Sequence, residues 1–225
     1  MVPSELPGVE LRFFDLDRLQ IDDAARWLSP SEVDRAAKFV FARDALRFRA
    51  AHVALRRALA AQCGLAPRVE FEIGANGKPC LSSPGCGFNL SHTGNRALIG
   101  IAIDEGRGDI GHIGVDIESV KHFDDLELLA QDTLTQSELA ELAQACPASR
   151  VETFLRGWTR KEACLKAVGS GLTVDARSVH VGLGTDTRIV TFSIGSERLA
   201  VKVTSLDAGH GILAAVALSD AMNHN

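Results

Sequence analysis

Apolar and polar positions form their clearest pattern in residues 154–172, whose sequence is FLRGWTRKEACLKAVGSGL. Apolar side chains recur there at the three- and four-residue spacing of one helical face, and two glycines end the pattern. The face comprises Val151, Phe154, Leu155, Trp158, Glu162 and Leu165. Lys166 follows Glu162 by one turn, and such a pair on a solvated face stabilises a helix by only about 0.3 kcal/mol. A carboxylate within an apolar face needs a cation or hydrogen bonds to remain ionised, so we predict a helix that carries chemistry.

Three further stretches predict helices. Residues 29–32, with the sequence SPSE, form a capping box with proline at the first helical position, so a helix begins there. Residues 44–62 are rich in Ala, Leu and Arg and are followed by a glycine, which is typical of a long helix. A helical stretch also runs from residue 135 through residue 168.

Alternating or short apolar runs predict the strands, and residues 74–87 are polar and rich in turn formers. We place Ser91 to Gly94 in the turn that follows the second strand. The expected strands are residues 9–15, 88–90, 97–103, 113–118, 189–194, 199–205 and 212–218.

The sequence also aligns weakly with itself at an offset of 106 residues. Residues 8–11 (GVEL) align with 114–117 (GVDI), and 28–32 (LSPSE) with 134–138 (LTQSE). Three acids of the second copy, Asp116, Glu118 and Glu162, align with Glu10, Arg12 and Arg56. We therefore expect an α+β fold of two similar halves, 1–108 and 109–225, related by a pseudo-twofold axis. Each half would contain an antiparallel sheet and a long helix, with one composite site between the halves.

Composition narrows the class of protein. The 225 residues are 46% apolar with a mean hydropathy of +0.07, which is typical of a soluble globular chain. The first ten residues lack the apolar core of a signal peptide, and no apolar run approaches 18 residues, so we expect a cytoplasmic protein without a membrane partner. Five cysteines without a C-x-x-C pair favour reduced packing residues over a disulfide framework.

Charge is distributed unevenly along the chain. The net charge of −5 gives no indication of a nucleic-acid partner. Residues 35–68 nevertheless hold eight Lys or Arg against one acid, Asp44. One half can therefore bind anions, and the acid-rich second half can bind cations.

Asp116 and Glu118 alternate with apolar residues in the sequence IGVDIE, so on a strand they share a face about 6 to 7 Å apart. A solvated strand face would explain this pair by itself. Two like charges so close also favour a cation, and with Glu162 as a third hard oxygen ligand the set suits Mg²⁺.

Two basic segments invite a phosphate interpretation. Lys78 lies in a Gly-Lys-Pro turn, where proline stiffens the loop and lysine is a compact phosphate partner. The surrounding residues are not a P-loop, because Glu72 and Pro79 replace the required glycine and hydroxyl. Ser91-His92 lacks the G-x-S-x-G of a hydrolase. His92 either makes a local hydrogen bond or contacts a phosphate.

Four polar or charged segments follow one another along the chain. They are Gly77-Lys78-Pro79, Asn89-Leu90-Ser91-His92-Thr93-Gly94, Gly114-Val115-Asp116-Ile117-Glu118 and Trp158-Thr159-Arg160-Lys161-Glu162-Ala163-Cys164-Leu165-Lys166. The set resembles the 4′-phosphopantetheinyl transferases, and the most similar type is the long, pseudodimeric one named for surfactin-synthetase activation. The resemblance extends from residue 29 to residue 172. G-V-D-I-E followed some forty residues later by W-x-x-K-E-A-x-x-K is its most specific part.

This resemblance implies Mg²⁺-dependent transfer of the phosphopantetheine arm of coenzyme A to a serine of an apo acyl or peptidyl carrier protein. Adenosine 3′,5′-bisphosphate would be released. Asp116, Glu118 and Glu162 match the metal acids, and Lys166 matches the lysine that contacts the pyrophosphate. The serine proton would go to Glu162 or to a water on the metal, and the sequence leaves that choice open. The expected coenzyme A contacts are Arg35, Arg47, Lys78, Ser91, His92, Asp116, Glu162 and Lys166. Glu32 departs from surfactin-type members, which can carry a basic residue there.

Two other functions use some of the same residues. A metal-dependent phosphohydrolase would need the acids but no protein acceptor, and a non-catalytic relative would bind the carrier without modifying it. We expect a monomer with one site. The carrier would dock on residues 119–150, with Phe123, Leu126 and Leu129 either in the interface or in this protein's own core.

Overall fold

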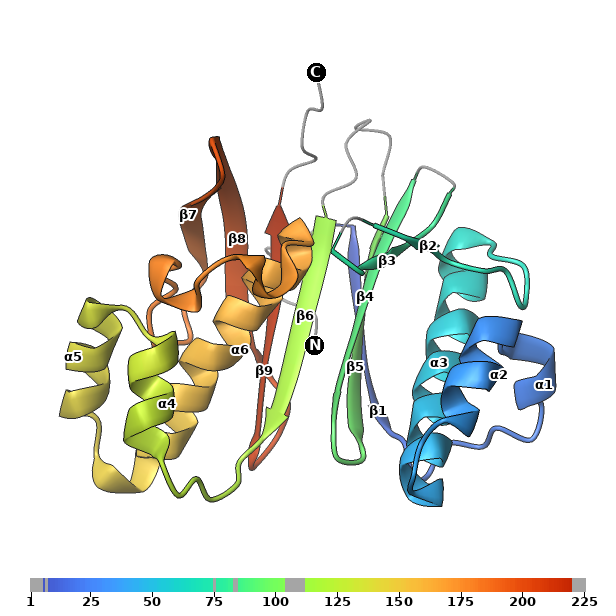
Figure 1. Cartoon of the computed structure of the whole chain (residues 1–225), viewed down its shortest axis with the longest axis horizontal. Helices are drawn as coiled ribbons and strands as arrows, with labels where there is room; N and C mark the ends of the chain where they lie inside the picture. Colours follow the sequence, from blue (N-terminus) through green and yellow to red (C-terminus); the bar gives the residue numbers. More distant parts are fainter. Residues whose placement is uncertain (1–5, 7, 75, 83–84, 104–111, 220–225) are drawn as a thin grey trace.

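The computed structural model of the chain describes residues 6, 8–74, 76–82, 85–103 and 112–219. Four layers follow one another: helix α3 (Ala42–Cys63), a first sheet, a second sheet, and helix α6 (Arg150–Val168) (Figure 1). The first sheet has the order β1-β5-β4 and the second the order β6-β9-β8-β7, with antiparallel pairing throughout. This is the expected α+β fold of two similar halves.

The two sheets share a topology. In the second sheet, β6, β9 and β8 take the places that β1, β5 and β4 have in the first. In the first half the elements are β1 (Val9–Asp15), α1 (Ala24–Trp27), α2 (Pro30–Ala37), α3, β2 (Glu72–Ile73), β3 (Pro79–Cys80), β4 (Cys86–Thr93) and β5 (Arg96–Ile103). In the second half they are β6 (His112–Ser119), α4 (Leu126–Thr133), α5 (Gln136–Gln144), α6, β7 (Arg188–Ile194), β8 (Glu197–Asp207) and β9 (Ile212–Ser219). Short 3-10 turns cover Pro147–Ser149, Gly171–Thr173 and Ala176–Ser178.

In both halves the second helix begins with a capping box. Ser29 accepts from the Glu32 backbone at the start of α2, and Thr135 accepts from the Glu138 backbone at the start of α5. The carboxylate of each glutamate in turn accepts a hydrogen bond from the backbone N–H of its cap residue. The aligned LSPSE and LTQSE segments thus have the same local structure, as the repeat predicts.

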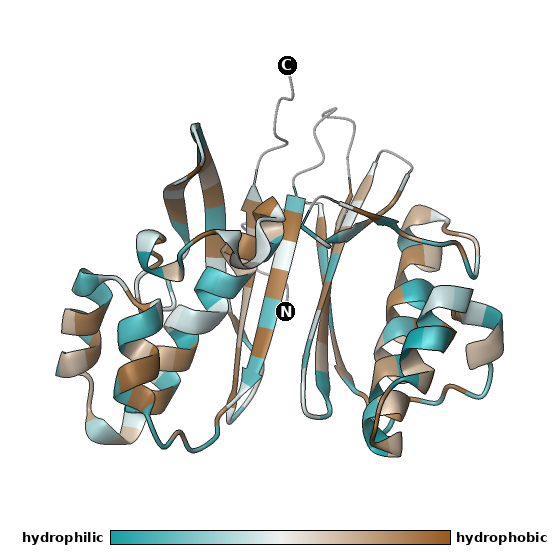
Figure 2. Cartoon of the chain, viewed as in Figure 1, coloured by the Kyte–Doolittle hydropathy of each residue, from teal (hydrophilic) through white to brown (hydrophobic). Residues whose placement is uncertain are grey.

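An apolar core lies between the two sheets. Leu98 of β5 and Ile113, Val115 and Ile117 of β6 are all buried in it. The other face of β6 carries Gly114, Asp116 and Glu118, and Figure 2 shows this alternation of apolar and polar residues along the strand. The acids therefore point away from the core between the sheets, on the same face as Gly114.

Two glycines permit the close approach of these layers. A Cβ atom at Gly114 would lie 2.1 Å from the carbonyl oxygen of Ala163 in α6. A Cβ at Gly100 of β5 would lie 2.7 Å from a methyl group of Val115. Only glycine lets α6 pack directly on β6, which brings the chemistry of that helix next to the acids of the strand.

The structure corrects two details of the predicted elements. The helical stretch expected through residues 135–168 is broken between α5 and α6, where Pro147 cannot continue a helix. His92 and its neighbours lie in β4, where His92 pairs with Ala97, and the turn consists of Gly94, whose φ is 55°, and Asn95.

The cysteine prediction was wrong for one pair. Cys63 at the end of α3 and Cys86 at the start of β4 form a disulfide, with Cα atoms 6.2 Å apart. An odd number of cysteines does not prevent one pair from meeting in space. Cys164 is a buried packing residue as expected, and Cys80 and Cys146 are exposed thiols. Among the described helices, none combines the length and apolarity that a membrane span requires.

Candidate active site

Asp116 is the most buried acid on this face of β6, with 3% of its surface exposed. Its Oδ1 accepts hydrogen bonds from Lys166 Nζ at 2.6 Å and from Ser91 Oγ at 2.8 Å. Its Oδ2 is buried and has no hydrogen-bond partner in the described part of the chain. A buried carboxylate oxygen without a donor is costly, and a cation would satisfy it.

Glu118 and Glu162 lie around Asp116. Glu162 Oε2 is 3.9 Å from Lys166 Nζ, and Glu118 accepts a hydrogen bond from the Thr93 hydroxyl at 3.3 Å. Burial raises the pKa of both glutamates, and the negative charge of Asp116 raises them further. The three carboxylates therefore repel one another across a shared space, and binding of a hard cation would relieve that repulsion.

The donor set fits a magnesium ion in chemistry but not yet in geometry. Over residues 6, 8–74, 76–82, 85–103 and 112–219, no three acid, histidine or cysteine side chains are grouped closely enough to hold an ion as they stand. The ammonium of Lys166 instead lies against Asp116. The predicted ligands Asp116, Glu118 and Glu162 are thus gathered in one region, and their carboxylates would have to turn inward to share a metal.

The strand of the first half supplies the other side of this site. Ser91 of β4 lies between Asp116 and Lys166, whose Nζ donates to Ser91 Oγ at 3.2 Å. Asn89, two residues earlier, accepts a hydrogen bond from the Val115 backbone at 2.9 Å and ties β4 to β6. Asn89 was not predicted as a site residue, although a buried amide within an apolar strand is a signal of such a bridge.

Positive charge gathers next to Ser91. Although solvent reaches His92, packing of protein around its ring lowers its pKa, and the charges of His52, Lys166 and Arg35 lower it further. The Arg35 guanidinium lies 5.4 Å from the centre of the Phe48 ring. Neither Arg35 nor His92 has a carboxylate partner among the described residues, so this region is suited to an anion.

Arg47 and Lys78 have partners within the protein. The guanidinium of Arg47 binds the Asp17 carboxylate through two hydrogen bonds of 2.6 and 2.8 Å. Lys78 reaches across to the second half, where Nζ donates to the carbonyl oxygens of Ile113 and Ala167 at 2.9 and 3.0 Å. Burial lowers the pKa of Lys78 to about 8. Lys78 thus joins the two halves, in addition to any contact with a ligand.

An apolar cavity of about 200 Å³ opens beside the acids. It is lined by Glu118, Lys121, Phe123, Leu129, Thr133, Phe154, Leu155 and Trp158. Phe123 also packs edge-on against Phe154 at 6.0 Å, and Leu126 packs in the same cluster. Two of the apolar residues considered for carrier docking therefore contribute to this protein's own core, whereas Leu128 and Leu129 of α4 remain exposed.

Comparison with known proteins gives the family. The profile of the 4′-phosphopantetheinyl transferase superfamily matches residues 112–216, and that of the 4′-phosphopantetheinyl transferase N-terminal region matches residues 17–102. The chain is 35% identical over 163 residues to the 4′-phosphopantetheinyl transferase HetI of Nostoc sp., covering 70% of this chain and 66% of HetI. It is 32% identical to AcpT of Salmonella typhimurium, over 67% of each chain, and 25% identical to Sfp of Bacillus subtilis strain 168, over 86% of this chain and 84% of Sfp. The chain belongs to the 4′-phosphopantetheinyl transferase superfamily.

Proposed function

We propose that this protein transfers the phosphopantetheine arm of coenzyme A to a serine of an apo acyl or peptidyl carrier protein and releases adenosine 3′,5′-bisphosphate. The observation that carries the proposal is the contact of Asp116 with both Ser91 and Lys166. Ser91 belongs to the first half, and the other two residues belong to the second. The contact joins an anion-binding region to a cluster of carboxylates, as a metal-assisted reaction on a pyrophosphate requires.

The carboxylate cluster supports a metal requirement. Asp116, Glu118 and Glu162 would hold Mg²⁺, which, when bound, supplies positive charge that neutralises the pyrophosphate oxygens of coenzyme A and the adenosine 3′,5′-bisphosphate leaving group. The unpartnered Oδ2 of Asp116 and the raised pKa values of the two glutamates support this assignment. Each carboxylate would be stabilised in its ionised form by the same ion.

The transfer breaks one bond and forms one bond. The carrier serine Oγ attacks the phosphorus on the pantetheine side of the pyrophosphate, and the bond from that phosphorus to the bridging oxygen breaks. Glu162 is suited to accept the serine proton, because its raised pKa makes it a stronger base than an ordinary glutamate. Lys166, one turn further along α6, would donate to the bridging oxygen as negative charge develops on the adenosine bisphosphate.

Coenzyme A would lie along the first half. Arg35 and His92, which have no carboxylate partners among the described residues, would bind phosphate groups, and Ser91 would donate near the pyrophosphate. Arg47 and Lys78 would have to exchange their present partners to contribute. We also propose that the protein acts as a monomer of the surfactin-activating type, since the two halves already supply both sides of one site, and that its carrier docks near Leu128 and Leu129.

Intact mass spectrometry of an apo carrier protein tests the function. After incubation with coenzyme A and Mg²⁺, the carrier should gain one phosphopantetheine arm, and a carrier whose modified serine is replaced by alanine should gain nothing. Cleavage of coenzyme A without the carrier would indicate a phosphohydrolase. An unmodified carrier that nevertheless binds would indicate a non-catalytic relative, and either result would overturn the proposal.

A further inference from the structure

The structure assigns His52 as a further coenzyme A ligand that binds the 3′-phosphate, an inference that rests on the proposed function. His52 was not among the residues selected from the sequence. It lies on α3, one helical turn after Phe48 and one before Arg56. Its neighbours are the two first-half groups, Arg35 and His92, that have no carboxylate partner among the described residues.

Glu32 fixes the His52 ring. The Nδ1 atom of His52 lies 2.7 Å from Glu32 Oε1, and the ring centre is 4.1 Å from that of Phe48. The second oxygen of Glu32 accepts from Arg56 Nε at 2.7 Å and from the Ser29 backbone at 2.9 Å. The carboxylate of Glu32 therefore has protein donors on both oxygens and presents no free oxygen to a bound phosphate.

The charge of this group is positive when His52 is protonated. Glu32 is ionised at neutral pH, because hydrogen bonds from His52 and Arg56 outweigh burial and lower its pKa to about 2. Its single negative charge then lies between the cations Arg56 and His52, which leaves one excess positive charge. Arg56 is 1% exposed, whereas the His52 side chain is 20% exposed, so solvent and ligands meet the charge at His52.

The neighbours of His52 identify an anion as its ligand. Among the neighbouring charges that lower the pKa of His92, that of His52 has the largest effect, followed by those of Lys166 and Arg35. Arg35 extends from α2 over the same Phe48 ring against which His52 packs. An imidazolium whose Nδ1–H donates to Glu32 retains Nε2–H as a second donor. Arg35 and a protonated His52, with His92 beside them as a further hydrogen-bonding group, fit a phosphate monoester, which is more highly charged than a phosphate within a pyrophosphate chain.

This assignment also explains the acid at position 32. Glu32 by itself would repel a phosphate. Because Glu32 is paired with the buried Arg56 and holds the partly exposed His52 in place, His52 presents the positive side of the group to a ligand.

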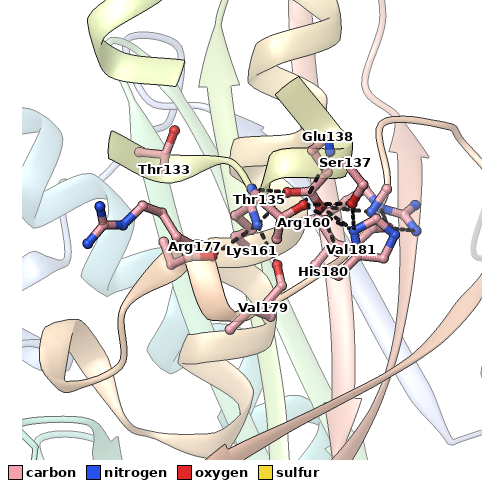
Figure 3. Close-up of polar contacts among 12 residues, drawn as sticks. Thr133, Thr135, Ser137, Glu138, Arg160, Lys161, Arg177, Val179, His180 and Val181 are labelled. Carbon is pink, nitrogen blue, oxygen red and sulfur yellow. Dashed lines mark hydrogen bonds and ion pairs between the residues drawn. The ribbon is translucent and has the colours of Figure 1, made fainter. Parts of the chain in front are cut away.

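The equivalent glutamate of the second half lacks these features. Glu138 Oε1 lies 3.6 Å from His180 Nδ1, and Figure 3 shows His180 beside Thr135 and Ser137. Glu138 is bound mainly by Lys161, at 2.7 Å. His180 is not among the charges that shift the pKa of His92. His180→Gln is therefore a matched control, because it changes a histidine that also lies next to a capping-box glutamate.

Calorimetric titration with coenzyme A and with 3′-dephospho-coenzyme A tests the assignment. For His52→Gln we expect Kd for coenzyme A to rise roughly 10- to 100-fold, the range for loss of a hydrogen bond to a charged group, and Kd for the dephospho compound to stay unchanged. His52→Arg should restore most of the coenzyme A affinity, since arginine can bind both Glu32 and a phosphate. His180→Gln should change neither Kd.

Three results would overturn the inference: an unchanged coenzyme A affinity in His52→Gln, equal losses for both compounds, or no recovery in His52→Arg. Thermal unfolding of each variant shows whether a loss of coenzyme A affinity comes from misfolding. If His52→Gln is misfolded, recovery of affinity in His52→Arg is the test that remains. Because binding is measured without a carrier protein, failure of the transfer reaction leaves this experiment intact. Normal transfer with unchanged Kd values in His52→Gln would refute the inference alone.

Discussion

The two halves place carboxylates at matching positions and surround them with opposite charges. On β1, Glu10 is bound by Arg12 two residues later, with Arg12 Nε at 2.5 Å. On β6, Asp116 is followed two residues later by Glu118, which cannot donate and instead adds a second negative charge. One change at the position two residues along the strand therefore separates a carboxylate paired within its own strand from a cluster of acids whose negative charge exceeds what Lys166 can neutralise.

The capping-box glutamates differ in a similar way. Glu32 is bound by an arginine and a partly exposed histidine, whereas Glu138 is fully buried against Lys161, itself fully buried. Glu138 also accepts from the backbone of Val181 and Gly182, so it holds the segment before β7 against α5 and α6. The first-half glutamate lies next to the proposed coenzyme A-binding region, and the second-half glutamate fixes the helix that carries Glu162 and Lys166.

The largest effect should come from neutralising the strand acids. Asp116→Asn should lower kcat/KM for carrier modification by about 1000-fold or more, because it removes a charge that Lys166 contacts and that the proposed metal would contact. Glu10→Gln at the matching position should lower it less than about threefold, since Arg12 already neutralises Glu10. Steady-state kinetics with an apo carrier would show this. Comparable losses in both variants would mean that the halves contribute equally to catalysis.

The next largest difference concerns stability. Glu138→Gln should reduce the free energy of unfolding by about 3 to 5 kcal/mol, because Lys161 would remain buried without its partner. Glu32→Gln should cost roughly 3 kcal/mol, the value of a glutamate pKa lowered from 4.5 to about 2. Urea unfolding monitored by circular dichroism measures both. A larger loss for Glu32→Gln would reverse the ranking of the two glutamates.

The pH dependence of stability should have opposite signs at the carboxylate cluster of the second half and at Glu32 of the first. The pKa values of Glu118 and Glu162 are raised above 4.5, so the stability they contribute is present below pH 4.5 and is lost as pH rises through their folded values. Glu32, with a lowered pKa, contributes stability above pH 4.5 that is lost as pH falls toward about 2. Mg²⁺ should cancel the loss at higher pH and leave the acid limb unchanged. Unfolding curves with and without Mg²⁺ test this, and a metal effect confined to low pH would contradict it.

The smallest effect concerns Lys78, which touches both halves. If the Lys78 ammonium leaves the carbonyl oxygens of Ile113 and Ala167 to bind a phosphate of coenzyme A, the phosphate will raise the pKa of Lys78 from about 8. Binding of coenzyme A near pH 8 will then take up part of a proton. Titrations in buffers of different ionisation enthalpy measure that uptake. Lys78→Met should abolish it, and uptake that persists in this variant would belong to another group.

Local patterns predicted much of this fold. The alternation in residues 113–118 placed Asp116 and Glu118 on one face of a strand, and the capping box at residues 29–32 marked a helix whose equivalent the repeat located at residues 134–138. Each of these features depends on residues close together in the sequence, where backbone geometry alone decides which side chains meet.

Features that depend on distant residues were not predictable. The sequence pattern gives no sign that Lys161 is buried. Its ammonium is fully buried because it forms an ion pair with Glu138 of another helix. Lys78 looked like a phosphate ligand, and its carbonyl partners lie 35 and 89 residues away in the chain. The Cys63–Cys86 bridge likewise follows from how α3 packs on β4. A sequence pattern shows what a side chain can bind and does not show which partner the fold supplies.

The apolar core between the sheets makes the two halves depend on each other for burial. Its buried side chains come from β5 of one half and from β6 and β9 of the other, so neither half encloses that surface by itself. If the two halves were produced as separate fragments, each would expose an apolar sheet face. The two faces fit each other, so the fragments should associate. The smallest unit able to work is therefore the reassembled pair, and a break in the connection between the halves should be tolerated more readily than the loss of either one.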